Sequence, residues 1–267
     1  MSAVQVRQEG AVRILINNHP ATRNAITPDL CASLPAALIE AEADPEVGAI
    51  VLTGAGGFFC SGGDLRQIVT RHTLSPAERR MKVESLHGLI RAIRDCGKPV
   101  IAAVEGGAAG AGLSIALACD MLVTTRAAFF SVTYIKVGLT PDGGVTAFLA
   151  EFVSRQILTE LCLTGERISG EHLHAMGVVN RLTDQGAALN EAVALAARLA
   201  TAPARASERI KRLCRHAYGA GLEAQMALEA QYMVVSQGDA EAAEGIAAFL
   251  AKRPPDFLAL RKKPESH

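Results

Sequence analysis

The sequence predicts an α/β fold in which parallel strands alternate with helices and an all-helical segment closes the chain. Three observations support this prediction. Short β-branched apolar runs end in glycine-rich turns, helical patterns follow those turns, and alanine-rich helical patterns fill nearly all of the chain after residue 187. With 267 residues, of which 49% are hydrophobic, the chain can bury a large core.

The first predicted element is a hairpin. Residues 4–6 and 13–16 alternate between apolar and polar side chains on either side of a turn at Gly10. Thr27, which directly precedes a proline, is typical of a helix N-cap. We therefore expect a helix from this point to about residue 43.

Two buried strands follow, and each ends in a glycine-rich turn. The runs 48–53 and 99–104 are continuously apolar, as in strands that are covered on both faces, and the turns occupy 59–65 and 106–112. The remaining expected elements of this part are helices near 80–95 and 111–118, a strand at 119–124 and a short strand near 129–130. This alternation predicts right-handed β-α-β crossovers in a parallel sheet.

The C-terminal part is predicted to be helical. Helical patterns cover 187–201, 205–217, 221–236 and 239–250, with short breaks between them. A division follows from this change of pattern: residues 1–195 form a ligand-binding core and residues 196–267 form a helical assembly region.

Composition excludes several classes of function. Lys and Arg together number 27, as do Asp and Glu, and aromatic residues make up only 4%, so we expect no nucleic-acid surface. The six cysteines are scattered without metal-type spacing, which indicates reduced thiols, no disulfides and no bound metal. The N-terminus lacks the apolar core of a signal peptide, and charges and glycines interrupt the apolar region 100–123. These features predict a cytoplasmic protein without a membrane span.

The two glycine-rich turns indicate where chemistry takes place. At a turn from a strand into a helix, peptide N–H groups point outward and carry the positive end of the helix dipole. Two such turns at neighbouring strands can bring two backbone donors to one anion or to one developing oxyanion.

The chain resembles the crotonase superfamily, the enoyl-CoA hydratase/isomerase group, over nearly its whole length. The segments that carry the resemblance occur in the family's order and lie at 19–25, 59–65, 98–106, 110–120, 137–144 and 163–169. The resemblance implies a crotonase-type spiral of β-β-α units with a C-terminal helical trimerisation region. It also implies a homotrimer, or a homohexamer formed by two trimers.

The resemblance further implies that the substrate is an acyl-CoA thioester and that no separate cofactor is needed. By motif position, the backbone N–H groups of Gly63 and Ala111 would polarise the thioester carbonyl. The residues expected at the CoA thioester are Arg23, Ser61, Gly63, Asp64, Leu65, Arg66, Ala111 and Lys252. For the three cations in this set, a solvated surface charge is the alternative.

The chain departs from the family's hydratases at two positions. Family hydratases carry a pair of glutamates, and the matching residues here are Ser114 and Tyr134. Neither a serine hydroxyl nor a phenol of ordinary pKa is an effective general base near neutral pH. One carboxylate remains in a turn that the family directs at the acyl group, namely Asp142.

Asp142 is the predicted acid/base residue. One carboxylate is sufficient for a 1,3-proton shift, so isomerisation of an enoyl-CoA is the leading hypothesis. A hydratase or a ring-opening hydrolase is an alternative in which Tyr134 either assists or forms a pocket wall. Two alternatives for Asp142 are a helix N-cap and the nucleophile of a dehalogenation, although the chain has few aromatic residues to line a dehalogenation site.

The sequence offers further candidate residues and two alternative functions. His87 matches a functional histidine of the related dehalogenases, but packing on its helix is the simpler role. Cys60 is expected to be a small buried residue, and Asp64 to fix the first turn. A non-catalytic CoA-thioester binder is an alternative function. A nucleotide-binding oxidoreductase fails, because Ile115 occupies the third glycine position of the dinucleotide fingerprint.

Overall fold

The computed structural model describes residues 2–261, and a six-stranded sheet forms its centre. The strands of this sheet lie in the order β1 (Val4–Glu9), β2 (Val12–Asn17), β3 (Ala49–Gly54), β4 (Val100–Val104), β6 (Met121–Thr125) and β9 (Arg181–Thr183). β1 and β2 are antiparallel, and every later neighbour pair is parallel. The predicted opening hairpin and parallel sheet are therefore confirmed.

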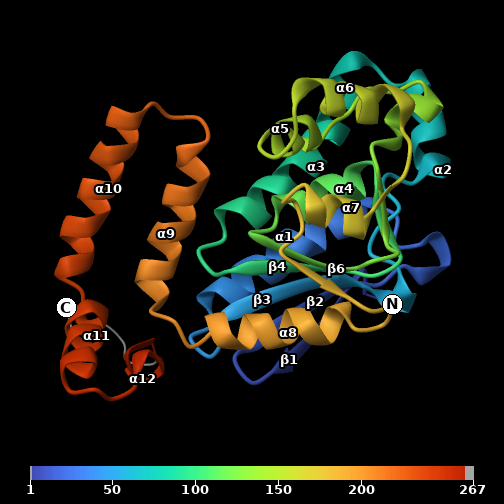
Figure 1. The fold of residues 1–267 in the computed structure, drawn as a ribbon. Helices are drawn as coiled ribbons and strands as arrows, with labels where there is room; N and C mark the ends of the chain where they lie inside the picture. The colour runs from blue at the N-terminus through green and yellow to red at the C-terminus, as the bar shows by residue number, and fades with distance from the viewer. Residues whose placement is uncertain (1, 262–267) are drawn as a thin grey trace.

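Helices cover both faces of this sheet (Figure 1). On one face α8 (Ala188–Leu199) buries alanines against β-branched side chains such as Val51 and Ile101. On the other face lie α1 (Pro28–Ala43), α3 (Pro76–Asp95) and α4 (Ala111–Ala118), packed against the alternate residues of the same strands, such as Ile50 and Leu52. Double coverage explains why these strands are continuously apolar in the sequence.

A second, three-stranded sheet continues from the second glycine-rich turn. It consists of β5 (Gly107–Ala109), β7 (Phe129–Ser131) and β8 (Ile168–Ser169), in that order. The short elements around it are α2 (Leu65–Ile68), α5 (Val145–Ala150), α6 (Arg155–Thr164), α7 (Gly170–Ala175) and the 3₁₀ segments η1 (Pro20–Thr22), η2 (Ala55–Gly57), η3 (Val69–Thr73) and η4 (Thr133–Val137). β7 confirms the short strand expected near residues 129–130, but β5 was not predicted, because it consists only of glycine and alanine.

The last four helices form a layer set apart from the sheet (Figure 1). They are α9 (Ala204–Ala217), α10 (Leu222–Gln237), α11 (Ala240–Leu250) and α12 (Phe257–Arg261), which confirms the predicted helical character of this region. α8 belongs to the sheet layer and spans the predicted division at residue 195. The division at residue 195 stays a prediction. In the structure the chain leaves the sheet layer between α8 and α9.

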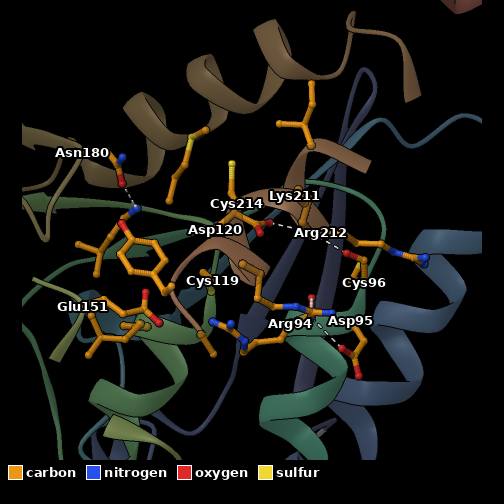
Figure 2. A pocket seen from close by; sticks show the side chains of 18 of the residues that line it. Arg94, Asp95, Cys96, Cys119, Asp120, Glu151, Asn180, Lys211, Arg212 and Cys214 are labelled. Atoms are coloured by element: carbon orange, nitrogen blue, oxygen red, sulfur yellow. Dashed lines mark hydrogen bonds and ion pairs between the residues drawn. The ribbon is translucent and has the colours of Figure 1, made fainter. Parts of the chain in front are cut away.

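Lys211 attaches α9 to the core. Its Nζ lies 2.7 Å from Asp120 Oδ2 and donates to the backbone carbonyls of Cys96 and Lys98 at 2.7 and 2.6 Å. The Lys211 side chain is only 13% exposed. Asp120 also accepts from the Val100 N–H at the start of β4. One ammonium group thus connects a C-terminal helix to two segments of the core, as Figure 2 shows.

Within residues 2–261, no helix has both the length and the apolar character that crossing a bilayer requires.

We predict that Lys211→Met lowers the free energy of unfolding by about 2 kcal/mol, because it leaves the largely buried Asp120 carboxylate without its counter-ion. Arg126→Met is the matched control, since the Arg126–Glu171 pair is more than half exposed on both sides and should contribute about 0.5 kcal/mol or less. Urea unfolding of both variants measures the difference. Equal losses of unfolding free energy in the two variants would show that Lys211 does not anchor α9.

Candidate active site

The two glycine-rich turns meet at the carboxyl ends of the neighbouring parallel strands β3 and β4. Gly62 has φ +93° and Gly110 has φ +52°, and both values favour glycine. A side chain on Gly62 would lie 2.7 Å from the carbonyl oxygen of Ala109 and 3.5 Å from the Ala111 nitrogen. A side chain on Gly110 would lie 4.0 Å from the Gly62 Cα. The close contact of the turns therefore requires glycine at position 62, whereas at position 110 glycine is favoured by the positive φ.

Backbone hydrogen bonds fix the two turns to each other. Ala109 N–H donates to the Cys60 carbonyl at 3.0 Å, and Cys60 N–H donates to the Gly107 carbonyl at 3.3 Å. The first turn is also tied to the preceding loop, because Ile26 N–H donates to the Gly62 carbonyl at 2.8 Å. These bonds use the groups beside the predicted oxyanion donors and leave the donors themselves available.

The amides of Gly63 and Ala111 are available for a ligand. Ala111 is the first residue of α4, where an N–H has no partner within the helix. Across residues 2–261, neither amide donates a hydrogen bond to another protein group. Two free N–H groups on contacting turns, one of them at the positive end of a helix dipole, form an arrangement suited to an oxyanion.

Asn24 is a structural residue of the site to which sequence reasoning gave no role. It is fully buried and has φ +57°, a conformation that asparagine tolerates better than most residues. Its side-chain amide donates to the Ala55 carbonyl at 2.8 Å and accepts from the His19 N–H at 2.8 Å. Asn24 thereby holds the loop 19–24 against the first turn. The sequence alone does not show that Asn24 has a positive φ, because asparagine also occurs in ordinary loops and helices.

Tyr134 and Asp142 form a hydrogen-bonded pair beside the second turn. Tyr134 Oη donates to Asp142 Oδ1 at 2.8 Å. The Tyr134 Cζ lies 4.0 Å from the position that a Gly110 Cβ would take, so the phenol ring lies beside the turn that presents Ala111. Asp142 itself is half-buried. Tyr134 thus holds the Asp142 carboxylate near the turn that presents the sequence-predicted donor Ala111.

The phenol in this pair remains protonated. Burial, and secondly the negative charge of Asp142, raise the pKa of Tyr134 well above its ordinary value. A phenol with a raised pKa neither accepts nor gives up a proton readily near neutral pH. Tyr134 can therefore act as a hydrogen-bond donor to the carboxylate, and the carboxylate is the group of the pair that can exchange a proton.

The helix-cap interpretation of Asp142 is wrong. α5 begins at Val145, its N-cap is Gly144, and no side chain caps it. The Asp142 carboxylate is instead directed to the phenol of Tyr134. The turn therefore presents this carboxylate at the site and does not use it to begin a helix.

The residues predicted at the CoA thioester divide into two groups. Most lie together around the first turn: Arg23, Ser61, Gly63, Asp64, Leu65, Arg66 and, across the contact, Ala111. Lys252 does not join them, because it directly follows α11, which lies apart from α2 and the first turn in Figure 1. Within one chain, Lys252 and Arg66 are therefore not parts of one site.

The side chains of the first turn have definite local partners. Ser61 Oγ donates to the Thr22 carbonyl at 2.9 Å, and its N–H donates to the Arg23 carbonyl at 3.0 Å. Asp64 caps α2, since its Oδ1 accepts from the Arg66 N–H at 3.0 Å, which confirms that Asp64 fixes the turn. The Arg23 guanidinium lies 5.6 Å from the centre of the Phe58 ring.

Two further sequence candidates, Cys60 and His87, have defined surroundings. Burial raises the pKa of Cys60 to about 12, so this thiol does not supply a thiolate nucleophile at neutral pH. His87 lies on α3, where its Nδ1 is 3.5 Å from a carboxylate oxygen of Glu84 one turn earlier. Among the described residues, no group of three or more His, Cys, Asp or Glu side chains is arranged to hold a metal ion.

A cavity of about 360 Å³ lies away from the two turns, between the end of α3, the start of β6 and α9 (Figure 2). Its charged side chains include internal pairs, such as Lys211 with Asp120 and Arg215 with Asp95. Burial raises the pKa of Cys96 in its wall to about 11. The charged groups of this cavity pair with each other and join α9 to the core. We therefore assign the candidate active site to the two glycine-rich turns.

Comparison with known proteins identifies the family. Residues 7–259 match the enoyl-CoA hydratase/isomerase family. The chain is 35% identical to the 1,2-epoxyphenylacetyl-CoA isomerase of Escherichia coli K12, over 93% of this chain and 95% of that protein. It is 31% identical to the 2,3-dehydroadipyl-CoA hydratase of the same organism, over 96% of this chain and 99% of that protein.

A solved structure gives the same result. The enoyl-CoA hydratase of Polaromonas sp. JS666 is 42% identical and superposes with a TM-score of 0.92, over 94% of this chain and 98% of that one. The resemblance that the sequence motifs indicated is thus confirmed in both sequence and fold. The chain belongs to the enoyl-CoA hydratase/isomerase family, within the crotonase superfamily, and has the crotonase fold.

Proposed function

We propose that this protein is an enoyl-CoA isomerase that moves a double bond along the acyl chain of a CoA thioester, with Asp142 as the single proton carrier. One observation carries the proposal. Asp142 is held by Tyr134 next to the paired turns, while Ser114 and Tyr134 occupy the two positions where the family's hydratases have glutamates. A site with one carboxylate suits a reaction in which the same group removes and returns the proton.

The reaction requires no other reactant. The Asp142 carboxylate removes a proton from C2 of a 3-enoyl thioester, and the electrons of that C–H bond move onto the thioester oxygen to give a dienolate. The protonated Asp142 then delivers the proton to C4, the thioester carbonyl re-forms, and the double bond lies between C2 and C3. The product has the composition of the substrate.

The Gly63 and Ala111 amides stabilise the dienolate in this proposal. Negative charge develops on the thioester oxygen during proton removal, and a donor fixed in advance stabilises that charge without reorganisation. Loss of one such donor typically costs about 2.7–4 kcal/mol of transition-state stabilisation. Any residue other than proline supplies the N–H, so the alanine at position 111 preserves the donor.

Tyr134 orients the carboxylate. Because its phenol donates to Oδ1, the other oxygen, Oδ2, is the one left to face the acyl chain. A hydrogen bond to an ionised group contributes about 1.5–3 kcal/mol, enough to select one orientation of the side chain. Tyr134 is therefore a positioning residue in the proposed mechanism and not its acid.

The first turn and its neighbours form the proposed CoA site. Arg23 and Arg66 are exposed cations beside this turn and suit the phosphates of the nucleotide. Lys252 could contribute only from another copy of the chain, because it lies with the separate C-terminal helices. The acyl group is the part of the substrate that meets Tyr134 and Asp142.

Hydration is the second candidate function. The Asp142 side chain is half-buried, so solvent has access to it, and a relative with 31% identity is named a hydratase. In that reaction Asp142 would activate a water molecule for addition to a 2-enoyl thioester. Isomers and hydrated products differ by the mass of one water, so a single assay separates the two candidates.

We predict that Asp142→Asn lowers kcat by about 10³-fold, because an amide cannot carry the proton. The control is Asp184→Asn, which changes an aspartate in an exposed loop. We incubate both variants and the wild type with 2-enoyl- and 3-enoyl-CoA thioesters in deuterated water. Isomerisation gives a product with the double bond moved and without gain of water, and the control retains it. Product that has gained water would support hydration, and full activity of Asp142→Asn would remove Asp142 from the mechanism.

We also propose that the C-terminal helices assemble the chain into a homotrimer or homohexamer. α10 and α11 expose large apolar side chains, including Met233, Val234, Ile246 and Phe249, of which the last is 83% exposed. An exposed apolar surface of this kind is typical of a subunit interface.

We predict that the protein sediments at three or six times its 28.0 kDa chain mass. Phe249→Glu should shift the distribution toward smaller species, because it places a charge on the proposed interface. Ile39→Glu, at an exposed apolar position on α1, is the control and should leave the distribution unchanged. A wild-type monomer in sedimentation velocity would rule out the proposed assembly.

A further inference from the structure

Ser114 connects the helix of one oxyanion donor to the turn of the carboxylate. It lies on α4, three residues after Ala111, and its side chain is completely buried. Its Oγ donates to the backbone carbonyl of Asp142 at 3.0 Å. Residues three apart lie on the same side of a helix, so Ala111 and Ser114 face the site together.

The Asp142 backbone is held from two directions. Its carbonyl oxygen accepts from Ser114 Oγ, while Tyr134 Oη, which lies 3.3 Å from the same oxygen, donates its one proton to the carboxylate of this residue. Tyr134 belongs to η4 and Ser114 to α4. The position of the carboxylate thus depends on two separate elements, α4 and η4.

The fit of Ser114 against this turn is close. A side chain on Gly143 would lie 2.9 Å from both the Cβ and the Oγ of Ser114, and 3.5 Å from Leu86 on α3. The backbone of the turn therefore packs directly on the serine.

From this geometry we propose that Ser114 is a positioning residue that sets the distance between the oxyanion donors and the Asp142 carboxylate. The inference rests on the proposed proton transfer by Asp142. Ser114 fixes the turn to α4, the same helix whose first N–H binds the thioester oxygen. In a proton transfer the carboxylate must lie at hydrogen-bond distance from the carbon that it serves, and a displacement of about 1 Å can cost 10²-fold in rate.

The test compares Ser114→Ala with Thr124→Val. Thr124 is the matched control, since it is also fully buried and its hydroxyl donates to a backbone carbonyl, that of Val104, at 2.9 Å within the sheet. The readouts are the urea midpoint, kcat, KM and the number of deuterium atoms taken up from deuterated water per molecule of product. Both variants lose one buried hydrogen bond, so the urea midpoint of both is expected to fall.

Only Ser114→Ala should change the chemistry. We expect kcat to fall about 10-fold or more with KM unchanged, and deuterium uptake per product to rise, because a misplaced carboxylic acid exchanges its proton with solvent before returning it. Thr124→Val should retain the kcat and the deuterium uptake of the wild type. If Ser114→Ala does not fold, Ser114→Cys, which fills the space with a weaker donor, is judged by the same criteria.

The outcomes separate this inference from the proposed function. If Asp142→Asn is inactive while Ser114→Ala matches Thr124→Val in kcat and in deuterium uptake, the serine is only a stabilising residue and the inference is overturned. If Asp142→Asn retains wild-type turnover, the proton-transfer proposal and the inference both fail.

Discussion

The site depends on the direct contact between two backbone turns that have no side chains between them. β3 and β4 are parallel neighbours, so their carboxyl ends bring the two turns to the same edge of the sheet. Gly62 then allows the turns to approach, because a methyl group on it would come within 2.7 Å of a carbonyl oxygen. Any displacement of one turn would separate the amides of Gly63 and Ala111, and with them the proposed binding of the thioester oxygen.

The second constraint is the burial of a phenol beside a carboxylate. Tyr134 is nearly inaccessible to solvent, and its raised pKa keeps it as a donor. A donor that cannot ionise readily orients Asp142 without competing for the proton that the carboxylate is proposed to carry. The large family to which the chain belongs includes proteins named isomerases and hydratases, so the fold does not determine the reaction. Within this fold, the side chains beside the acyl group are what select one reaction over another.

Much of the fold could be predicted from the sequence because its signals are local. The β-branched runs at β3 and β4, the turns that follow them and the alanine-rich C-terminal helices are each visible within a short window. β5 was missed because glycine and alanine have low strand propensity. Its three residues form a strand through backbone pairing with β7.

The site was predictable only in part. The turns and Asp142 could be found from motif positions, but the contact between Tyr134 and Asp142 joins a 3₁₀ segment to an irregular loop, and neither has a periodic pattern. The helix-cap alternative for Asp142 was plausible from residue preference alone and failed because α5 begins later, at Val145. The separation of Lys252 from the first turn depends on how the C-terminal helices leave the sheet, which no local signal specifies.

The most direct test of the central claim is a crystal structure with a non-reactive acyl-CoA thioether or thioester analogue bound. The account predicts that an analogue that retains the carbonyl places its oxygen about 2.7–3.1 Å from the nitrogens of both Gly63 and Ala111. It also predicts that Asp142 Oδ2 faces the acyl carbons next to that carbonyl while Oδ1 keeps its bond to Tyr134. A carbonyl bound away from the two turns, or an acyl chain that does not approach Asp142, would contradict it.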